Sequence, residues 1–214
     1  MSVNLEFENK FWSKFDFIAG CDEVGRGALA GPVYVGSVIF DKNISIFDLP
    51  VRIDDSKKLT AIQREKASLW IKKYAYYYKT SSSTSKLIDK IGIVKATNIA
   101  FRKSLSKKTQ FLLMDAFWLP FTKGLPKSKQ MPIIKGDQKS ITIASASIIA
   151  KVERDKYMQI IGEKRKFRNY SFGIHKGYAT ANHIKAIEKF GLSSEHRVSF
   201  SRKIKASFAF SQAQ

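Results

Sequence analysis

Hydrophobic and polar positions alternate with a period of two in some segments and recur every three to four residues in others. Each change of period marks the start of another expected strand or helix. Short apolar or alternating runs bounded by glycine, proline, asparagine or serine are typical of β-strands. Runs of this kind lie at 15–21, 32–40, 74–84, 111–115 and 131–134. We expect the first two strands to form a hairpin and the first three an antiparallel meander, with crossover helices leading to the others.

Apolar positions spaced by three and four residues predict helices between these strands. The expected helices follow Thr60, cover 88–105, run from Ile141 to about Phe167 with Ser140 as the N-cap, and run from about Thr180 to Phe190. Thr60 and Gln63 make a capping box, and Gly191 is a typical helix stop. The first half of the third helix is rich in alanine and serine, which lets a helix lie close to a sheet. The pattern predicts an α/β fold, with a five-stranded mixed sheet flanked by helices.

Length and composition fit a single domain over 1–214, with a helical C-terminal extension from about 168 to 214. The chain has 214 residues, of which 44% are hydrophobic. We expect residues 1–14 to form a loosely docked arm. No apolar run reaches the ~18 residues that span a bilayer, and no signal peptide opens the chain. A cytoplasmic monomer without a membrane partner is therefore expected.

The formal net charge of +20 indicates a polyanionic partner, because lysine and arginine displace counterions from phosphates. Biased lysine usage is the alternative explanation. Cys21 is the single cysteine, which excludes an internal disulfide and a cysteine zinc cluster. The three histidines, His175, His183 and His196, lack the paired spacing of a zinc site. Composition thus favours a nucleic-acid partner over a membrane surface.

Two adjacent acids, Asp22 and Glu23, stand at the expected end of the first strand, directly before a Gly-Arg-Gly turn. Acids at a strand end crowd negative charge that a divalent cation offsets, and glycines let the backbone approach a ligand closely. A solvated hairpin end would contain similar residues, but two strongly apolar strands flank these acids. The pattern indicates a metal-dependent enzyme that acts on a phosphodiester.

Two further acids follow expected strands. Asp115 closes the fourth apolar run, at the carboxyl edge where ligands bind in open α/β sheets. Asp137 follows the last strand and Gly136 in the same way. Asp155 is the alternative to Asp137, but pairing with Lys151 four residues earlier on a helix explains Asp155 structurally. We choose Asp137 for the site and keep Asp155 as the fallback.

The hexapeptide Asp22-Glu23-Val24-Gly25-Arg26-Gly27 resembles the signature of the ribonuclease HII family, the type 2 ribonucleases H. The resemblance covers roughly residues 15 to 200 in the family's order. Its further motifs are Asp55-Ser56-Lys57-Lys58-Leu59, Ile134-Lys135-Gly136-Asp137, Ala146-Ser147-Ile148-Ile149-Ala150-Lys151-Val152 with Arg154-Asp155, His175-Lys176-Gly177-Tyr178, and His196-Arg197 with Ser199-Phe200. It implies a ribonuclease H-like fold whose first strand lies centrally, beside the strand that ends in Asp115.

The resemblance implies an endoribonuclease that cuts the RNA strand of RNA–DNA hybrids and nicks duplex DNA at embedded ribonucleotides. Its products would carry 5′-phosphate and 3′-hydroxyl ends. The cofactors would be Mg²⁺ or Mn²⁺, two ions in the active complex, since hard cations prefer carboxylate oxygens and paired ions suit in-line displacement. The catalytic and metal-binding residues would be Asp22, Glu23, Asp115 and Asp137.

Substrate contacts are expected from three segments. Gly25, Arg26 and Gly27 have an uncrowded backbone that fits a minor groove and its 2′-hydroxyl, and Tyr178 is expected to pack on the neighbouring sugar, as the similar family tyrosine does. Lys57 and Lys58 precede a helix, where lysines oppose the helix dipole unless an anion is near. We assign both lysines to backbone phosphates; an ordinary solvated loop is the alternative.

One geometric difficulty concerns the first two acids. Successive strand residues point to opposite faces, so Asp22 and Glu23 do not both aim at one ion from a regular strand. The backbone bends there, or Glu23 reaches around, or Glu23 contributes through its carbonyl or a water. We take Asp22 as the ligand shared by both ions.

Three other functions remain open from the residues. A non-catalytic nucleic-acid binder would use charge and aromatic residues alone. Another nuclease or an integrase on the same fold would have no use for the Gly-Arg-Gly turn and Tyr178. Ribonuclease HIII is the nearest relative, but it normally carries an N-terminal platform domain, and only 21 residues precede Asp22. We therefore expect no such platform.

Overall fold

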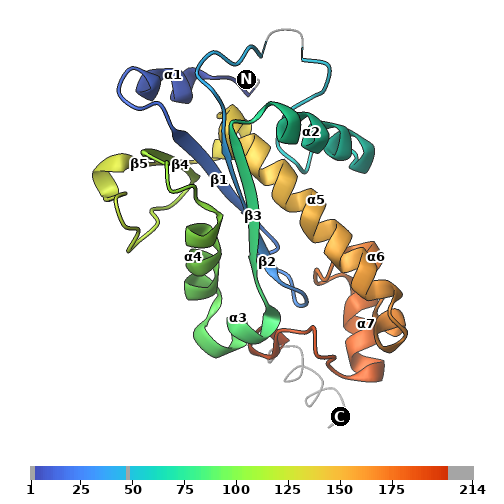
Figure 1. The fold of residues 1–214 in the computed structure, drawn as a ribbon. Helices are drawn as coiled ribbons and strands as arrows, with labels where there is room; N and C mark the ends of the chain where they lie inside the picture. Colours follow the sequence, from blue (N-terminus) through green and yellow to red (C-terminus); the bar gives the residue numbers. More distant parts are fainter. Residues whose placement is uncertain (1–2, 47–48, 202–214) are drawn as a thin grey trace.

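A five-stranded mixed sheet forms the centre of the molecule (Figure 1). The computed structural model describes residues 3–46 and 49–201. The strand order is β3-β2-β1-β4-β5. The strands are β1 Ile18–Val24, β2 Val33–Ile39, β3 Tyr77–Ser83, β4 Phe111–Asp115 and β5 Gln130–Ile133. The first three form the predicted antiparallel meander, and β4 and β5 run parallel to the central β1.

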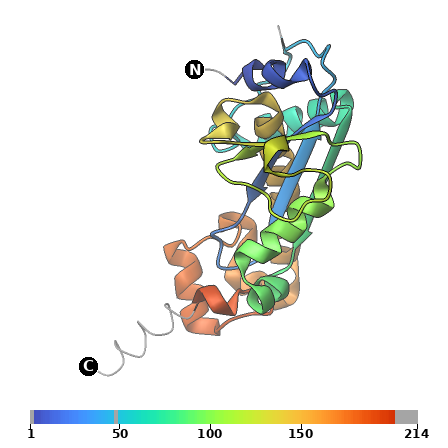
Figure 2. The same ribbon diagram turned by 90° about the vertical axis from the view of Figure 1, so that its left-hand side faces the viewer.

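Helices cover both faces of the sheet, which confirms the predicted α/β architecture (Figures 1 and 2). The helices are α1 Glu6–Trp12, α2 Ala61–Tyr74, α3 Ser85–Ile91, α4 Ile93–Ser104, α5 Ile141–Glu163, α6 Phe172–His175 and α7 Ala181–Phe190, with 3₁₀ turns η1 Lys127–Lys129, η2 Gly136–Gln138 and η3 Arg165–Tyr170. Helix α5 packs on β1 and β2 with α2 beside it, and α4 packs on β2 and β3 from the other face. Of the described helices, none is long and apolar enough to cross a bilayer.

The capping residues act as predicted, but several boundaries were wrong. Thr60 with Gln63 caps α2 and Ser140 caps α5, and Thr180, which we expected to begin its helix, is the N-cap of α7. Strand β1 begins at Ile18, three residues late, and continues to Val24, so the two acids lie within the strand and not after it. The third strand begins at Tyr77 because α2 continues through Tyr74.

Two predicted helices also differ in extent. The segment 88–105 is two helices, because Gly92 takes a positive φ of 82° that interrupts the α-helical backbone. Helix α5 ends at Glu163, and the 3₁₀ turn η3 replaces its predicted last turn.

The N-terminal segment is not the loosely docked arm that we expected. It contains α1, whose Glu8 is fully buried against the start of α5. The Glu8 carboxylate accepts hydrogen bonds from the Ser140 hydroxyl (2.6 Å), the Thr142 hydroxyl (2.7 Å) and the Thr142 amide (3.0 Å). Trp12 is buried with apolar residues near the starts of β1 and β4. The polar appearance of residues 1–14 hid one internal carboxylate that caps a helix.

The C-terminal elements gather at the end of α5 (Figures 1 and 2). Helix α6 packs on α5, and α7 packs on η3. Residues 202–214 of the predicted extension lie outside the described residues. The segment before them joins the rest of the molecule at an isolated bridge between Ala30 and His196.

Helix α5 lies unusually close to the sheet because glycines face its small residues. A Cβ at Gly20 would clash with the backbone at Thr142, and a Cβ at Gly36 would clash with the carbonyl oxygen of Ala146. Ala144, Ala146 and Ala150 on α5 are all fully buried. The small residues of the helix were predicted to allow close packing; the matching glycines of β1 and β2 complete it.

Gly36→Ala is therefore expected to destabilise the fold by about 1–3 kcal/mol, because one added methyl group must push apart two backbones. Urea unfolding followed by circular dichroism measures this difference. Gly173→Ala is the matched control, since a Cβ there meets only ordinary van der Waals contacts. Equal midpoints for the two variants would contradict the close approach of helix and sheet.

Candidate active site

Asp22 and Asp115 are neighbours on adjacent parallel strands. The β1–β4 register pairs Cys21 with Met114 as its last pair, and the two aspartates follow. Cys21 and Met114 point into the apolar cluster under α4, so the next residue on each strand points to the α5 face. Asp22 is 6% exposed there. The meeting of these two acids across 93 positions was predicted, and the register places them side by side.

Glu23 points to the opposite face, as the strand geometry required. Its backbone amide donates to Asp22 Oδ1 at 2.8 Å. Its carboxylate pairs with Arg26, whose Nη1 lies 3.3 Å from Glu23 Oε1. The Arg26 guanidinium in turn lies 5.8 Å from the ring centre of Phe117, which packs on Phe101 of α4. Because β1 stays regular through Val24, Glu23 has to reach around the strand to approach Asp22.

Asp137 joins the other acids through the 3₁₀ turn after β5. The Gly136 amide donates to Asp115 Oδ1 at 2.8 Å, which ties this turn to the end of β4. The neighbouring cation is Lys57, whose Nζ lies 3.5 Å from Asp137 Oδ2 and 3.9 Å from Asp55 Oδ1. Lys58 lies apart, with its Nζ 3.4 Å from Asp54 Oδ1. Of the two predicted phosphate-binding lysines, Lys57 therefore faces the carboxylates and Lys58 does not.

The electrostatics of these acids show that they crowd one another. Burial raises the pKa of Asp22 well above its usual range, and the charges of Glu23, Asp115 and Asp137 raise it further, although the Ser147 hydroxyl opposes them. Burial also raises the pKa of Glu23, against the effect of Arg26. The pKa of Asp137 is raised by burial and by Asp55.

The donor set fits a hard divalent cation, although the side chains stand apart. Carboxylate oxygens are the ligands that Mg²⁺ and Mn²⁺ prefer. Burial and the charges of the neighbouring acids raise the pKa of Asp22, yet within 3–46 and 49–201 no three acid, imidazole or thiol side chains are close enough to hold an ion as they stand. Both findings fit acids that are near one another but too far apart to share an ion, because charges interact over longer distances than a metal–ligand bond.

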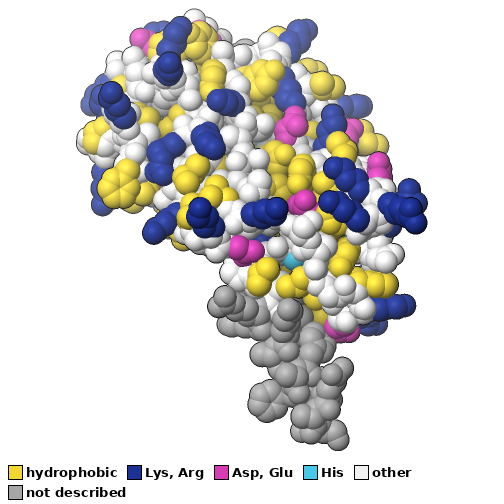
Figure 3. Space-filling view, turned by 60° about the horizontal axis from the view of Figure 1, so that its bottom comes forward, with side chains coloured by type: hydrophobic (Ala, Val, Ile, Leu, Met, Phe, Trp, Pro, Cys, Tyr) yellow, Lys and Arg dark blue, Asp and Glu magenta, His cyan; other side chains and the backbone are white. Residues whose placement is uncertain are grey.

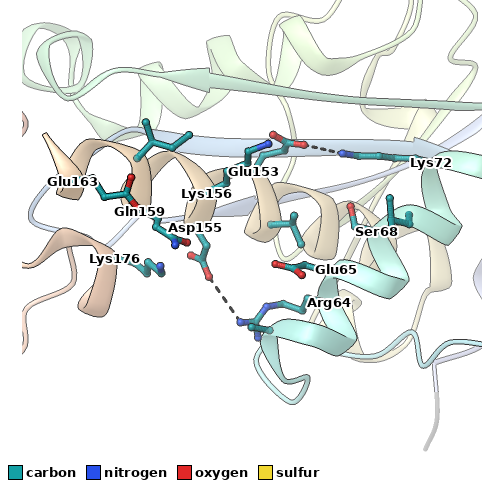
Figure 4. Close-up of a pocket in the computed structure, with 14 residues that line it drawn as sticks. Arg64, Glu65, Ser68, Lys72, Glu153, Asp155, Lys156, Gln159, Glu163 and Lys176 are labelled. Carbon is teal, nitrogen blue, oxygen red and sulfur yellow. Dashed lines mark hydrogen bonds and ion pairs between the residues drawn. The ribbon is translucent and has the colours of Figure 1, made fainter.

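Asp155, the fallback for the fourth acid, belongs to a different feature. It lines a cavity of about 650 Å³ between α2 and α5 (Figure 4). Its carboxylate lies 2.8 Å from Lys151 Nζ, as predicted, and 3.8 Å from an Arg64 nitrogen. Figure 4 shows Asp155 pointing toward Arg64 across this cavity. None of the four candidate site acids lines it. A carboxylate already neutralised by two cations has little left to offer an ion, which supports the choice of Asp137.

Two buried arginines, Arg154 and Arg197, contact the backbone of the Gly-Arg-Gly turn, and neither was given a role from the sequence. Gly25 has a φ of 86° and lies so close to Arg154 that a Cβ would clash with the guanidinium. Arg197 donates to the carbonyls of Gly25 and Arg26, each at 2.8 Å. Both arginines were inside the quoted motifs, but a basic residue in a basic chain gives no sign that it is buried.

Asp55 is a further residue whose role was missed. It is 5% exposed and accepts from the Lys57 amide at 3.0 Å and from Gln138 Nε2 at 3.1 Å. It therefore joins the loop before α2 to the turn that carries Asp137. Its position directly before Ser56 and Lys57 in one motif was the available signal.

Tyr178 lies on the same side as the turn. The Gly177 carbonyl accepts from the Leu29 amide (2.8 Å) and the Ala30 amide (3.2 Å). The half-buried Tyr178 ring lies 5.2 Å from Arg154 Cζ and 5.8 Å from Lys151 Nζ. The two predicted substrate segments, around Gly25 and around Tyr178, are thus connected by backbone hydrogen bonds.

A chain of neutral histidines holds the Tyr178 backbone. His183 Nδ1 lies 2.8 Å from the Tyr178 carbonyl, so Nδ1 carries the proton and Nε2 accepts. His196 Nε2, 3.0 Å away, must then donate to it. His196 Nδ1 is left to accept from the Ser193 amide at 2.9 Å, which agrees with this tautomer. Each ring satisfies its partners only when it is uncharged.

Acid is expected to loosen this cluster. Burial lowers the pKa of His183 and of His196 from an ordinary value near 6.5 to about 4. Between these values the unfolded chain binds more protons than the folded one, so stability is full above pH 6.5 and falls toward pH 4. Urea midpoints measured across this range test it. A His196→Gln variant should lose stability less steeply than wild type over that range, and identical slopes would contradict the role of the pair.

A comparison with known proteins identifies the family. The family model described as Ribonuclease HII matches residues 19–203. The chain is 41% identical over 201 residues to the ribonuclease HII of Chloroherpeton thalassium, which covers 92% of this chain and 96% of that protein. This chain belongs to the ribonuclease HII family. It is a ribonuclease H, an endoribonuclease that acts on RNA–DNA hybrids.

Solved structures agree with the fold of this ribonuclease HII. The ribonuclease H2 of Pyrococcus horikoshii OT3 superposes with a TM-score of 0.72 at 25% identity, covering 90% of this chain and 99% of that one. Bst-RNase HIII, solved in complex with Mn²⁺, superposes with a TM-score of 0.70 at 17% identity, covering 92% of this chain and 71% of that one. The ribonuclease H-like fold is confirmed.

Proposed function

We propose that this ribonuclease HII holds two divalent cations, Mg²⁺ or Mn²⁺, between Asp22, Glu23, Asp115 and Asp137, and cuts on the 5′ side of a phosphate to leave 5′-phosphate and 3′-hydroxyl ends. The observation that carries the proposal is the register of β1 and β4, which sets Asp22 beside Asp115 on the α5 face. The raised pKa of Asp22 adds to it, because crowded carboxylates gain when a cation offsets their charge. The Mn²⁺ bound by Bst-RNase HIII, on the same fold, is consistent with this choice of ions.

The ions, when bound, would supply activation of a water and stabilisation of the leaving oxygen. The protein's own residues hold the charges in place. Ser147 faces Asp22 from α5 and accepts or donates in a pair with Ser56, 3.0 Å away. The Gly136 amide fixes one oxygen of Asp115 and leaves the other for an ion. Lys57 opposes the acidic charge at Asp137 and can turn to a substrate phosphate, since its side chain is mostly exposed.

The substrate in this proposal includes duplex DNA with an embedded ribonucleotide. The backbone of Gly25, Arg26 and Gly27 would meet the 2′-hydroxyl, and Tyr178 would pack on the next sugar. Lys57 and Lys58 would contact phosphates, with Lys58 farther along the strand. Figure 3 shows a face on which lysine and arginine outnumber the acids, which suits a polyanion.

The proposal takes the chain as one catalytic domain that works as a monomer in the cytoplasm. All four proposed ligands belong to this chain, and residues from 168 onward contribute Tyr178 and Arg197 to the substrate side. The single cysteine is buried, so no intermolecular disulfide is expected.

A duplex with one ribonucleotide tests the proposed function. The protein should nick it in Mg²⁺ or Mn²⁺, leave the all-DNA duplex of the same sequence intact, and stop in chelator. Product ends are identified by ligation and by phosphatase treatment. Cutting of the all-DNA duplex would favour another nuclease on this fold, and binding without cutting would favour a non-catalytic protein.

Tyr178→Ala is expected to lower cleavage at the single ribonucleotide by about tenfold or more, because one stacking contact contributes about 1–3 kcal/mol. Mn²⁺ binding, measured by calorimetry, should stay the same because Tyr178 contacts none of the four acids. Tyr157→Phe, which removes only a hydroxyl bonded to Glu195, is the control. Unchanged cleavage in Tyr178→Ala would remove this residue from the site.

A further inference from the structure

Two neighbouring backbone amides of the Gly-Arg-Gly turn have no hydrogen-bond partner among residues 3–46 and 49–201. The turn is closed by a hydrogen bond from the Ala28 amide to the Gly25 carbonyl at 3.3 Å. The amides of Arg26 and Gly27, inside the turn, donate no hydrogen bond within the part of the chain that the structure describes. Both residues are exposed. Adjacent free amides are a common backbone device for binding an anionic or hydroxyl oxygen.

Arg197 fixes the direction of these amides through hydrogen bonds to the carbonyls of the same turn. It is fully buried, and its guanidinium donates to the Gly25 and Arg26 carbonyls at 2.8 Å each. The C=O and N–H of a trans peptide point in opposite directions. The two carbonyls that Arg197 holds share their peptide planes with the Arg26 and Gly27 amides. Turning those carbonyls inward therefore turns the two amides outward.

Arg154 extends the same arrangement to the Tyr178 side. It is fully buried and donates to the carbonyls of Pro32 (3.0 Å), Ala30 (3.3 Å) and Lys176 (2.9 Å). Its Nη1 is buried without a hydrogen-bond partner among the described residues. Because Lys176 precedes Tyr178 by two positions, one guanidinium bridges both substrate segments.

Burying two arginines costs desolvation free energy, which a purely structural role does not require. Neither forms a salt bridge with a carboxylate in the described ranges, and their hydrogen bonds there go to backbone carbonyls. Burial lowers the pKa of Arg197 to about 9, with a further contribution from the charge of Arg154. Apolar residues would fill this space at lower cost. Two positive charges buried behind a turn whose amides face solvent suit the binding of a negatively charged nucleic-acid strand at that turn.

We propose that Arg197 is a positioning residue for ribonucleotide recognition. By holding the carbonyls of Gly25 and Arg26 it presents the amides of Arg26 and Gly27 to oxygen atoms of the ribonucleotide, and Arg154 aligns Tyr178 with them. This inference rests on the proposed substrate role of the turn. It gives the C-terminal segment a direct part in specificity, since Arg197 follows α7.

Arg197→Lys is the variant that tests the inference. Lysine keeps the positive charge but has no planar fork to hold two carbonyls at once. In an Asp22→Asn background, which leaves the duplex uncut, fluorescence anisotropy at fixed salt gives Kd for a single-ribonucleotide duplex and for the all-DNA duplex. The ratio of the two Kd values should fall by about tenfold in Arg197→Lys, the effect of losing hydrogen bonds to a charged group.

Arg168→Lys is the matched control, because Arg168 donates to the Glu163 carbonyl away from the turn. It should keep the ratio. An unchanged ratio in Arg197→Lys would overturn the inference. So would equal weakening on both duplexes, because that result would give Arg197 a part in duplex binding that does not depend on the ribonucleotide.

A second measurement does not depend on the variant folding. In the Asp22→Asn protein, the Arg26 and Gly27 amides should exchange hydrogen rapidly when free and slow down when the single-ribonucleotide duplex is added. Protection of these amides in the free protein would overturn the inference. Wild-type cleavage of the same duplex is run alongside. No cleavage there would contradict the proposed function, whereas the binding ratio tests Arg197 and the exchange rates test the two amides.

Discussion

Asp22→Asn is expected to lower cleavage of an RNA–DNA hybrid by about a thousandfold or more. The substitution removes the carboxylate that lies among three others, and with it several kcal/mol of transition-state stabilisation that bound cations provide. Single-turnover cleavage in Mg²⁺ measures the loss. Binding of the hybrid should be kept or strengthened, because a negative charge facing the phosphates is gone.

Thermal unfolding separates this loss from misfolding. Burial disfavours the charged form of Asp22, so the neutral asparagine should unfold at the same temperature as wild type or higher. Lost activity with retained stability is the signature of a site residue that is costly to bury. Near wild-type cleavage in Mg²⁺ would show that the mechanism is wrong.

Asp137→Asn is expected to reduce cleavage by about a hundredfold or more, whereas Asp155→Asn should stay within about tenfold of wild type. Asp137 is tied to Asp115 through the Gly136 amide and is crowded by Asp55. Asp155 is instead paired with Lys151 and Arg64 at the cavity between α2 and α5. The two isosteric changes are compared in one cleavage assay with Mn²⁺ titrated from low to high concentration.

The Mn²⁺ concentration that each variant needs for cleavage is a second measurement that distinguishes Asp137 from Asp155. Losing a ligand should shift the Asp137→Asn titration to higher Mn²⁺, and Asp155→Asn should leave it in place. The reverse pattern would make Asp155 the fourth ligand, and a loss in both would mean that the cavity and the carboxylate cluster act together.

Most helices and strands could be predicted from local sequence patterns, because hydrophobic periodicity and helix caps depend on residues that are close in the chain. Thr60 and Ser140 cap helices where the sequence predicted caps. The failures have tertiary causes. Glu8 looks like a surface residue of an N-terminal arm, yet the hydroxyls of Ser140 and Thr142 bury it from more than 130 positions away. The split at Gly92 depends on a positive φ that apolar spacing does not reveal.

The four candidate acids could be chosen from the sequence, but the residues around them could not. Asp22 and Asp115 each follow apolar residues on strands, a local pattern, and the parallel pairing of those strands brings them together. Arg197 reaches the Gly25 carbonyl across 172 positions, and nothing local distinguishes it from the other basic residues. The histidines are similar: His183 and His196 hydrogen-bond to each other, and His175 and His183 hydrogen-bond to backbone carbonyls, contacts that the spacing along the chain does not reveal.

Locating Mn²⁺ by anomalous scattering, in crystals of the full chain with a duplex bound, tests the central claim most directly. The account predicts ions with oxygen atoms of Asp22 and Asp115 about 2.0–2.3 Å away, and with Asp137 and Glu23 turned in toward them. Ions bound only elsewhere, with none touching Asp22, would contradict it.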